Sequence, residues 1–227
     1  MTFNSNAIEG NKITARETTI ILEGLMIPRF QKQVTQAEFR QIIGHDKALK
    51  EIVRMVNADD QLTVERLLVL HQMVLQESSC GGILRSGEEL ALINRVKVLL
   101  GPPLAVEDVV KQFLGWLAKN NTMDPFLLAV TCHSIFVHIH PFKDGNGRMA
   151  RLLMNFVLLR AQYPYLIVLN KKLDQYLDAV LQWQDGDPQP LTNFMFKMLN
   201  ASFDKYFTAL GVTLDSPPSS PSRLKTE

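Results

Sequence analysis

The stretch that decides the fold is Phe126–Ile139, FLLAVTCHSIFVHI, which is followed after a short polar loop by Met149–Leu159, MARLLMNFVLL. The first stretch presents apolar residues on every face of a helix, and the second does so apart from Arg151 and Asn155. A helix that is apolar all round is a buried helix. The sequence therefore predicts two buried central helices, with the loop between them at one end of the core.

The connecting loop, His140-Pro-Phe-Lys-Asp-Gly-Asn-Gly-Arg-Met-Ala-Arg151, places polar groups at the end of this apolar framework. Pro141 cannot continue the first helix. Gly145 and Gly147 allow positive φ angles and the close approach of a ligand to the main chain. The second helix is expected to begin near Arg148, so its first N–H groups and its positive pole face the loop. Such a helix start is a natural seat for phosphate.

The side chains of the loop complement that seat. Arg148 and Arg151 are three residues apart, which makes them neighbours on a helix, and guanidinium groups bind phosphate oxygens in bidentate fashion. Asp144 is a hard oxygen ligand for Mg²⁺, and Asn146 can donate to an oxyanion. His140 can take a proton from a hydroxyl near neutral pH. These groups predict the transfer of a phosphoryl-type group from a nucleotide to a hydroxyl.

The string HPFKDGNGRMAR resembles the signature loop of the Fic family, His-x-Phe-x-Asp/Glu-Gly-Asn-Gly-Arg-x-x-Arg, at every specified position. The resemblance implies an enzyme that moves AMP from ATP onto a Ser, Thr or Tyr hydroxyl of a target protein. By position, His140 would be the base, Asp144 would hold Mg²⁺ and Phe142 would anchor the loop. The phosphates would be bound by Asn146, Gly147, Arg148 and Arg151.

A second segment, Ser5-Asn-Ala-Ile-Glu9-Gly10, resembles the inhibitory motif Ser/Thr-x-x-x-Glu-Gly/Asn of Fic proteins. The resemblance implies that Glu9 pairs with Arg151, with Ser5 as the other fixed position of the motif. An arginine held by a carboxylate is not free to hold a γ-phosphate. Because an alignment error of about 1 Å can cost ~100-fold in rate, the sequence predicts an autoinhibited enzyme.

Helical periodicity dominates the remaining chain. Further helices are expected at 14–26, 35–44, 46–56, 63–76, 107–119, 171–183 and 191–210, with a capping box at Thr35-Gln-Ala-Glu38. The exception is 78–100, where Arg95-Val-Lys-Val-Leu99 alternates like a strand and where the Fic family has a hairpin that pairs with the target's main chain. The expected fold is all-α, a Fic-type helical bundle around two central helices with a small β-hairpin flap.

The expected organisation has three parts. Residues 1–13 form an inhibitory helix segment, residues 14–210 the Fic catalytic domain, and residues 211–227 a disordered Pro/Ser-rich tail. In the Fic family the segment matching Tyr176–Gly186 builds the adenosine pocket, often with an aromatic pair and an Asn. This chain has Tyr176-Leu177 and Gln184 there, so Tyr176 is expected to line the adenine and the selectivity for the base is left open.

The other histidines do not predict a metal site. The spacing of His133, His138 and His140 does not place two ligands on successive turns of one helix face, and no cysteine pair is near, which argues against a zinc site. His133 and His138 are expected in the core or in a pocket wall. His45 and His71 are expected at the surface or at helix caps.

Composition narrows the class of partner. A chain of 227 residues with 46% hydrophobic and 21% charged residues is typical of one globular domain. The net charge of +1 and the lack of a basic stripe argue against nucleic acid as a partner. No apolar stretch approaches ~20 residues, so we expect no membrane segment and a cytoplasmic location, with a removed targeting segment and a homodimer left open.

Three functions compete at this stage. AMP transfer to protein is favoured, and removal of AMP stays open because Glu9 could position a water molecule. Phosphate or phosphocholine transfer on the same loop is the first alternative, although the intact second glycine, Gly147, argues against the phosphate-transferring branch of the family. A non-enzymatic nucleotide-binding interaction module is the second alternative, and the complete set of catalytic residues argues against it.

Overall fold

Two buried helices form the centre of the fold, as the sequence predicts. In the computed structural model, α6 (Pro125–Ile139) and α7 (Asn146–Arg160) pack against each other more extensively than any other described pair of elements. The Asp124 side chain caps the first of these helices by accepting from the Leu127 N–H at 2.9 Å. Residues 148–158 of α7 are all buried, so the loop joining the two helices starts and ends in the core.

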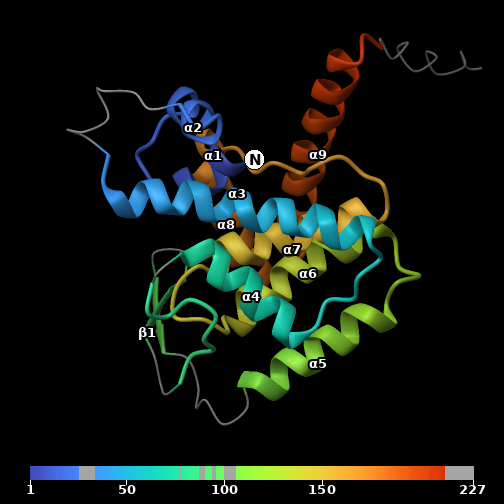
Figure 1. Ribbon diagram of the computed structural model, residues 1–227. Coiled ribbons are helices and arrows are strands. Elements are labelled where there is room, and N and C mark those ends of the chain that lie inside the picture. The colour runs from blue at the N-terminus through green and yellow to red at the C-terminus, as the bar shows by residue number, and fades with distance from the viewer. Residues whose placement is uncertain (26–33, 77, 87–89, 94–95, 100–105, 213–227) are drawn as a thin grey trace, which may run out of the picture.

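The other helices surround this pair (Figure 1). Their bounds are α3 (Gln36–Asn57), α4 (Val64–Leu75), α5 (Val106–Lys119), α8 (Leu173–Gln184) and α9 (Gln189–Ala209). α3 and α4 pack on each other and both contact α7, α5 contacts α6, and α8 and α9 pack together against α6. The C-terminal end of α9 projects beyond the bundle (Figure 1). The site loop is therefore held by helices from both halves of the chain.

The structure describes residues 1–25, 34–76, 78–86, 90–93, 96–99 and 106–212. The N-terminal helices α1 (Thr2–Ile8) and α2 (Ala15–Leu22) both lie on α3, and α1 also contacts α7 and the short 3₁₀ helix η3 (Asn170–Lys172). Two strands, β1 (Leu90–Ile93) and β2 (Val96–Leu99), form an antiparallel hairpin in which Leu90 lies opposite Leu99.

The predicted helical class is confirmed, but the helix boundary predicted at Gly44 is wrong. The sequence predicts two helices at 35–44 and 46–56, whereas the structure has the single helix α3. Gly44 does not end the helix. A Cβ built on Gly44 would lie 2.3 Å from the carbonyl oxygen of Met73, so this glycine allows the backbones of α3 and α4 to approach closely.

Parts of the predicted organisation fall outside the described residues. Residues 213–227 of the expected tail do so. The helix expected at 14–26 ends earlier than predicted, because α2 ends at Leu22 and Glu23 and Gly24 form a turn. Over the described residues, no helix combines the length and hydropathy needed to cross a membrane.

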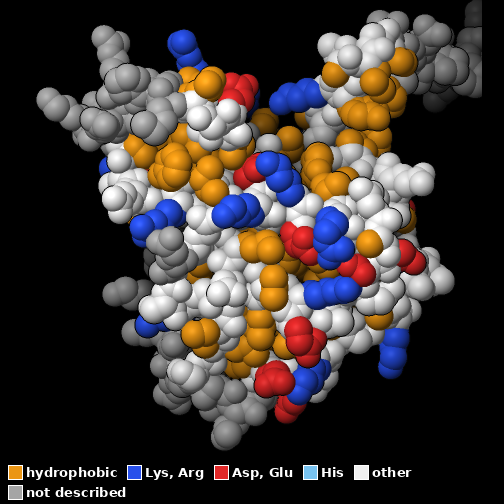
Figure 2. All heavy atoms as spheres, in the orientation of Figure 1, with side chains coloured by type: hydrophobic (Ala, Val, Ile, Leu, Met, Phe, Trp, Pro, Cys, Tyr) orange, Lys and Arg blue, Asp and Glu red, His pale blue; other side chains and the backbone are white. Residues whose placement is uncertain are grey.

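Charges of both signs are interspersed over the face shown in Figure 2, without a basic stripe on that face. Hydrophobic side chains gather at the projecting end of α9, where Tyr206, Leu210 and Val212 are exposed.

Candidate active site

The loop between α6 and α7 is shaped by its own residues. His140, the residue that ends α6, has left-handed backbone angles of φ 49° and ψ 57°. Gly145 caps the start of α7 with φ 80°, a region that favours glycine. Between them, the Asn146 side chain accepts from the Phe142 N–H at 3.0 Å and donates to the Phe142 carbonyl at 2.7 Å. The fully buried Phe142 thereby anchors the loop in the core.

A cavity of about 530 Å³ opens above this loop. Its walls come from the end of α1, from the loop itself and from α8. It brings together seven of the nine residues that the sequence singles out: Glu9, His140, Asp144, Asn146, Gly147, Arg151 and Tyr176. The other two, Ser5 and Arg148, do not line the cavity but bond to residues that do.

Arg151 is the residue on which α1 and α7 meet. Its Nε donates to the Ser5 hydroxyl at 3.0 Å, and its Nη2 donates to the Ser5 carbonyl at 2.9 Å and to Glu9 Oε1 at 2.7 Å. The Arg151 side chain is only 3% exposed, so this ion pair is shielded from solvent on the arginine side. The pairing of Glu9 with Arg151 that the family resemblance implies is present.

The Glu9 carboxylate lies at the start of α7. A Cβ built on Gly147 would be 2.6 Å from Glu9 Oε1, so only a glycine leaves room for the carboxylate there. The first intrahelical bond of α7 runs from the Met149 N–H to the Gly145 carbonyl, and the N–H groups before it belong to the unpaired first turn. Glu9 therefore occupies the region that the helix dipole makes favourable for an anion.

Arg148 and Asp144 form a second ion pair, with Nη2 and Oδ2 3.2 Å apart. The Arg148 side chain is 2% exposed, whereas that of Asp144 is 62% exposed. Arg148 Nε and Nη1 are buried and have no hydrogen-bond partner. Buried guanidinium donors without acceptors carry a desolvation cost that an anion would relieve.

The sequence interpretation treats Arg148, Arg151 and Asn146 as one phosphate-binding set, but in the structure their side chains have different partners. Arg148 turns to Asp144 and Arg151 turns to α1, although the two residues are neighbours along α7. The Asn146 amide is engaged by the Phe142 backbone, so it serves to shape the loop.

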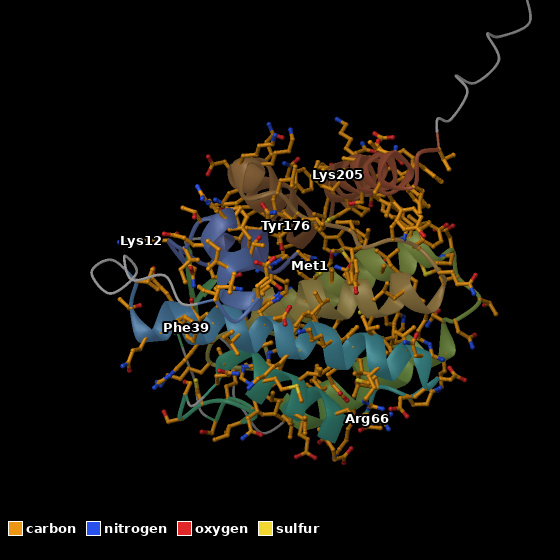
Figure 3. The ribbon with its side chains drawn as sticks, turned by 45° about the horizontal axis from the view of Figure 1, so that its top comes forward. Met1, Lys12, Phe39, Arg66, Tyr176 and Lys205 are labelled. Carbon is orange, nitrogen blue, oxygen red and sulfur yellow. The ribbon has the colours of Figure 1, made fainter. Side chains whose placement is uncertain are left out.

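Tyr176 reaches the cavity from α8 and is 3% exposed. Figure 3 shows it between α8 and the N-terminal helix α1. Its hydroxyl lies 2.8 Å from His133 Nε2 on α6, and the positive charge of Arg151 acts on it. Tyr176 thus connects α8 to α6 through His133, in addition to lining the cavity.

The electrostatic setting of His140 keeps its imidazole neutral. Burial lowers the pKa of His140 below its ordinary value, and the Arg85 guanidinium lowers it further. The Val137 carbonyl, Glu9 and Asp144 raise the pKa and offset part of this effect. A neutral imidazole is the form that can accept a proton.

Three of the other histidines lie where the sequence interpretation did not expect them. His45 and His71, expected at the surface or at helix caps, are fully buried, and His138, expected in the core or a wall, is exposed. His133 is buried as expected. The signal for His71 was present, because Leu67, Leu70, His71 and Val74 share one helix face.

A set of three or more His, Cys, Asp or Glu side chains suited to a metal ion is absent from the described part of the chain. A metal at Asp144 would therefore have one carboxylate ligand and take its remaining ligands from substrate and water, which is the way Mg²⁺ binds with nucleotides.

Burial lowers the pKa of His71, beside the Asp144 carbonyl, to about 4.

Comparisons with known proteins agree with this geometry. The chain is 34% identical over 215 residues to "Protein adenylyltransferase Fic" of Culex quinquefasciatus, covering 91% of this chain and 41% of the relative. It is 32% identical over 214 residues to the protein of the same name in Nematostella vectensis, covering 91% and 48%. The chain thus spans less than half the length of these two curated relatives.

The fold is also similar to that of solved structures. Fic-1 from C. elegans superposes with a TM-score of 0.81 at 28% identity, over 92% of this chain and 62% of that one. Residues 61–158 match the Fic/DOC family and include α4 to most of α7, with the whole loop from His140 to Arg151. Through this domain the chain belongs to the Fic/DOC family.

Proposed function

We propose that this protein is an adenylyltransferase that moves AMP from ATP to a Ser, Thr or Tyr hydroxyl of a target protein, and that its own Glu9 holds it at low activity. One observation carries the proposal. The cavity above the α6–α7 loop contains a neutral histidine, an exposed carboxylate and the anion-binding start of a helix, with Glu9 bonded to the arginine at its edge. The names of the curated relatives point to the same activity.

ATP fits this cavity at its charged end. The first-turn N–H groups of α7 and the guanidinium groups of Arg148 and Arg151 would hold the phosphates. Asp144 would hold Mg²⁺, which when bound neutralises charge on the phosphates. The adenine would lie against the α8 wall, where Tyr176, Leu177 and Val180 line the cavity.

The reaction needs a base, an aligned phosphorus and a leaving group. In the proposed step, His140 takes the proton of the target hydroxyl while the hydroxyl oxygen attacks the α-phosphorus of ATP. A new oxygen–phosphorus bond forms, the bond between the α-phosphorus and its bridging oxygen to the β-phosphate breaks, and pyrophosphate leaves. His140 can accept this proton because its lowered pKa keeps the ring neutral at neutral pH.

Inhibition follows from the position of Glu9. Its carboxylate occupies the start of α7 and bonds to Arg151, so a triphosphate bound there would lack both the helix end and that guanidinium. ATP that enters would bind with its α-phosphorus out of line, and an error of about 1 Å can cost ~100-fold in rate. Removing the Glu9 carboxylate makes the start of α7 and the Arg151 guanidinium available to the triphosphate.

The target segment would dock on the β1–β2 hairpin. An extended peptide can add to an exposed strand by main-chain hydrogen bonds, which leaves the identity of the target's side chains largely unread. This is the use that we assign to the flap predicted from the sequence.

The first test separates the candidate chemistries by the position of a label in ATP. We expect label from the α-phosphate, and none from the γ-phosphate, to appear on protein with the Glu9→Gly variant. The unmodified chain should label at least ~10-fold more slowly, given the alignment cost above. His140→Ala in the Glu9→Gly background should abolish labelling.

The control variant is Glu23→Gly, because Glu23 ends α2 as Glu9 ends α1 but does not line the cavity. It should label like the unmodified chain. Label from the γ-phosphate would instead show phosphorylation, and ATP binding without any label would show a binding module. Equal labelling of the Glu9→Gly variant and the unmodified chain would remove the inhibitory role.

Removal of AMP is a second activity that the same cavity supports. Glu9 lines it together with His140, so its carboxylate can orient a water molecule towards a bound AMP-protein. The corresponding test incubates AMP-modified protein with the unmodified chain and with Glu9→Gly. Release of AMP only by the unmodified chain supports this activity, and no release by either excludes it.

A further inference from the structure

A short segment, residues 82–85, crosses the catalytic loop and is called the clamp segment here. Leu84 pairs with Phe142 in an isolated antiparallel β-bridge. The Arg85 N–H donates to the Pro141 carbonyl at 2.9 Å, and Arg85 Nε donates to the His140 carbonyl at 3.1 Å. The clamp segment therefore holds the main chain of the loop at three successive residues, beginning with the proposed base.

This hold matters because the backbone of His140 is strained. A φ of 49° is unfavourable for a non-glycine residue, and it persists only where the surrounding contacts impose it. Arg85 fixes the carbonyl of that residue. The direction of the His140 side chain depends on these backbone angles.

His71, on α4, joins the clamp segment to the loop. Its Nδ1 accepts from the Gly82 N–H at 2.9 Å, and its Nε2 lies 2.9 Å from the Asp144 carbonyl. An amide N–H can only donate and a carbonyl can only accept, so Nδ1 must be bare and Nε2 must carry the hydrogen. Only one neutral tautomer of the imidazole satisfies both bonds.

The ring also fills the space between these two segments. It stacks on Phe142 with ring centroids 3.6 Å apart and an interplanar angle of 8°. A Cβ built on Gly145 would lie 3.3 Å from His71 Nε2, so the start of α7 packs directly against the imidazole. His71 thus contacts the loop at Phe142, at the Asp144 carbonyl and at Gly145, the N-cap of α7.

We propose that His71 is a positioning residue for AMP transfer, because its imidazole bonds the clamp segment and the catalytic loop into a single register that sets His140 and Asp144. The proposal rests on the proposed function.

Three substitutions at this position separate its two bonds, and all are made in the Glu9→Gly background. His71→Asn keeps an acceptor near the place of Nδ1 for the Gly82 N–H and loses the bond to Asp144. His71→Gln keeps a donor near the place of Nε2 for the Asp144 carbonyl and loses the bond to Gly82. His71→Phe keeps the stack on Phe142 and loses both bonds.

Two measurements are made on each variant: the amide exchange rate of Gly82, and the kcat of AMP transfer together with the Kd for ATP. Exchange at Gly82 should speed up at least ~10-fold in His71→Gln and His71→Phe but not in His71→Asn, because protection follows the bond to His71. His71→Phe should lower kcat ~100-fold with the Kd for ATP within ~3-fold, since it misaligns the base without removing a phosphate ligand.

Recovery of part of the lost kcat by His71→Asn or His71→Gln supports positioning through the hydrogen bonds. The control is His45→Gln, a buried histidine on α3 that bonds to Thr2, which should leave exchange at Gly82 unchanged. A folded His71→Phe variant with kcat within ~2-fold of its parent would overturn the proposal, because misalignment of ~1 Å costs far more. Should the parent transfer no AMP, the proposed function fails, and unchanged Gly82 exchange in His71→Phe would still overturn the clamp.

Discussion

Arg151 shows at the residue scale how one side chain can serve both the resting and the active protein. It is buried, so its donors need partners, and Ser5 and Glu9 accept from its Nε and Nη2. In the proposed enzyme only the Glu9 bond has to break for a triphosphate to bind, and the bonds to Ser5 can keep the guanidinium in place.

Removal of the Tyr176 hydroxyl is expected to weaken the binding of ATP. Tyr176→Phe removes a hydroxyl on which the charge of Arg151 acts and leaves His133 Nε2 without its partner. In the Glu9→Gly background we expect the Kd for ATP to rise ~10-fold, which corresponds to about 1.4 kcal/mol, because the cavity wall loses the bond that joins α8 to α6. Titration with ATP measures it. A Kd within ~2-fold of the parent would show that nucleotide binding does not need this contact.

The lowered pKa of His140 predicts how the rate of AMP transfer depends on pH. The folded protein lowers its pKa below the ordinary value of about 6.5, so the basic form persists as the pH falls through that value. The kcat/KM of the Glu9→Gly variant should therefore decline on the acid side with a midpoint below about pH 6.5. A rate profile from pH 5 to 8 provides the measurement. An acid limb centred above pH ~6.5 would mean that the Asp144 carboxylate and the Val137 carbonyl outweigh burial.

At the scale of elements, the stability of α1 depends on its contacts with the rest of the protein. It has seven residues, too few for a helix to be stable alone. Polar contacts hold it and the turn after it: Asn4 Oδ1 accepts from the Asn170 N–H at 3.0 Å, and Asn11 Nδ2 donates to the Glu38 carbonyl at 3.0 Å. Hydrogen bonds of this kind contribute about 1 kcal/mol each, so a small change at these contacts can release Glu9.

Asn11→Ala tests this dependence without touching the cavity. It removes the bonds to the Glu38 carbonyl and to the Gln41 side chain, and it removes the acceptor of the Ile13 N–H. Labelling of the otherwise unmodified chain should rise at least ~3- to 10-fold, as expected for about 1 kcal/mol from one such bond. In the Glu9→Gly background the same substitution should change nothing, since the lock is already absent. Equal acceleration in both backgrounds would mean that Asn11 acts on the site by another route.

At the scale of the whole molecule, the close approach of α3 and α4 sets the frame in which His71 reaches the loop. Gly44→Ala would place a Cβ 2.3 Å from a backbone oxygen of Met73, and the helices would have to separate. We expect a loss of about 1–3 kcal/mol in the free energy of unfolding, measured with urea. Gly115→Ala on α5 is the matched control, because its Cβ would meet nothing within 4 Å.

The control should be neutral or stabilising by up to about 1 kcal/mol, as for a helical glycine in open space. A Gly44→Ala variant as stable as the unmodified chain would mean that α3 and α4 can shift without cost. Loss of stability in both variants would instead point to a general sensitivity of the bundle to substitution.

The sequence by itself determined most of the helices and the set of polar residues in the loop between α6 and α7. The all-apolar faces of α6 and α7 predict a buried pair, Thr35 caps its helix as predicted, and the spacing from His140 to Arg151 predicts one polar loop. These features depend on residues within a few positions of one another. Local periodicity and capping therefore reveal them.

The tertiary structure alone decided which partner each polar group meets. Arg148 and Arg151 are neighbours along α7, yet one turns to Asp144 and the other to Ser5, which lies 146 positions away in the chain. The helix α3 continues through Gly44 because α3 and α4 approach closely there. The apolar helix face around His71 indicates burial, but only the packed chain places its imidazole against the loop. Long-range hydrogen-bond partners are properties of the packed chain, and no local pattern contains them.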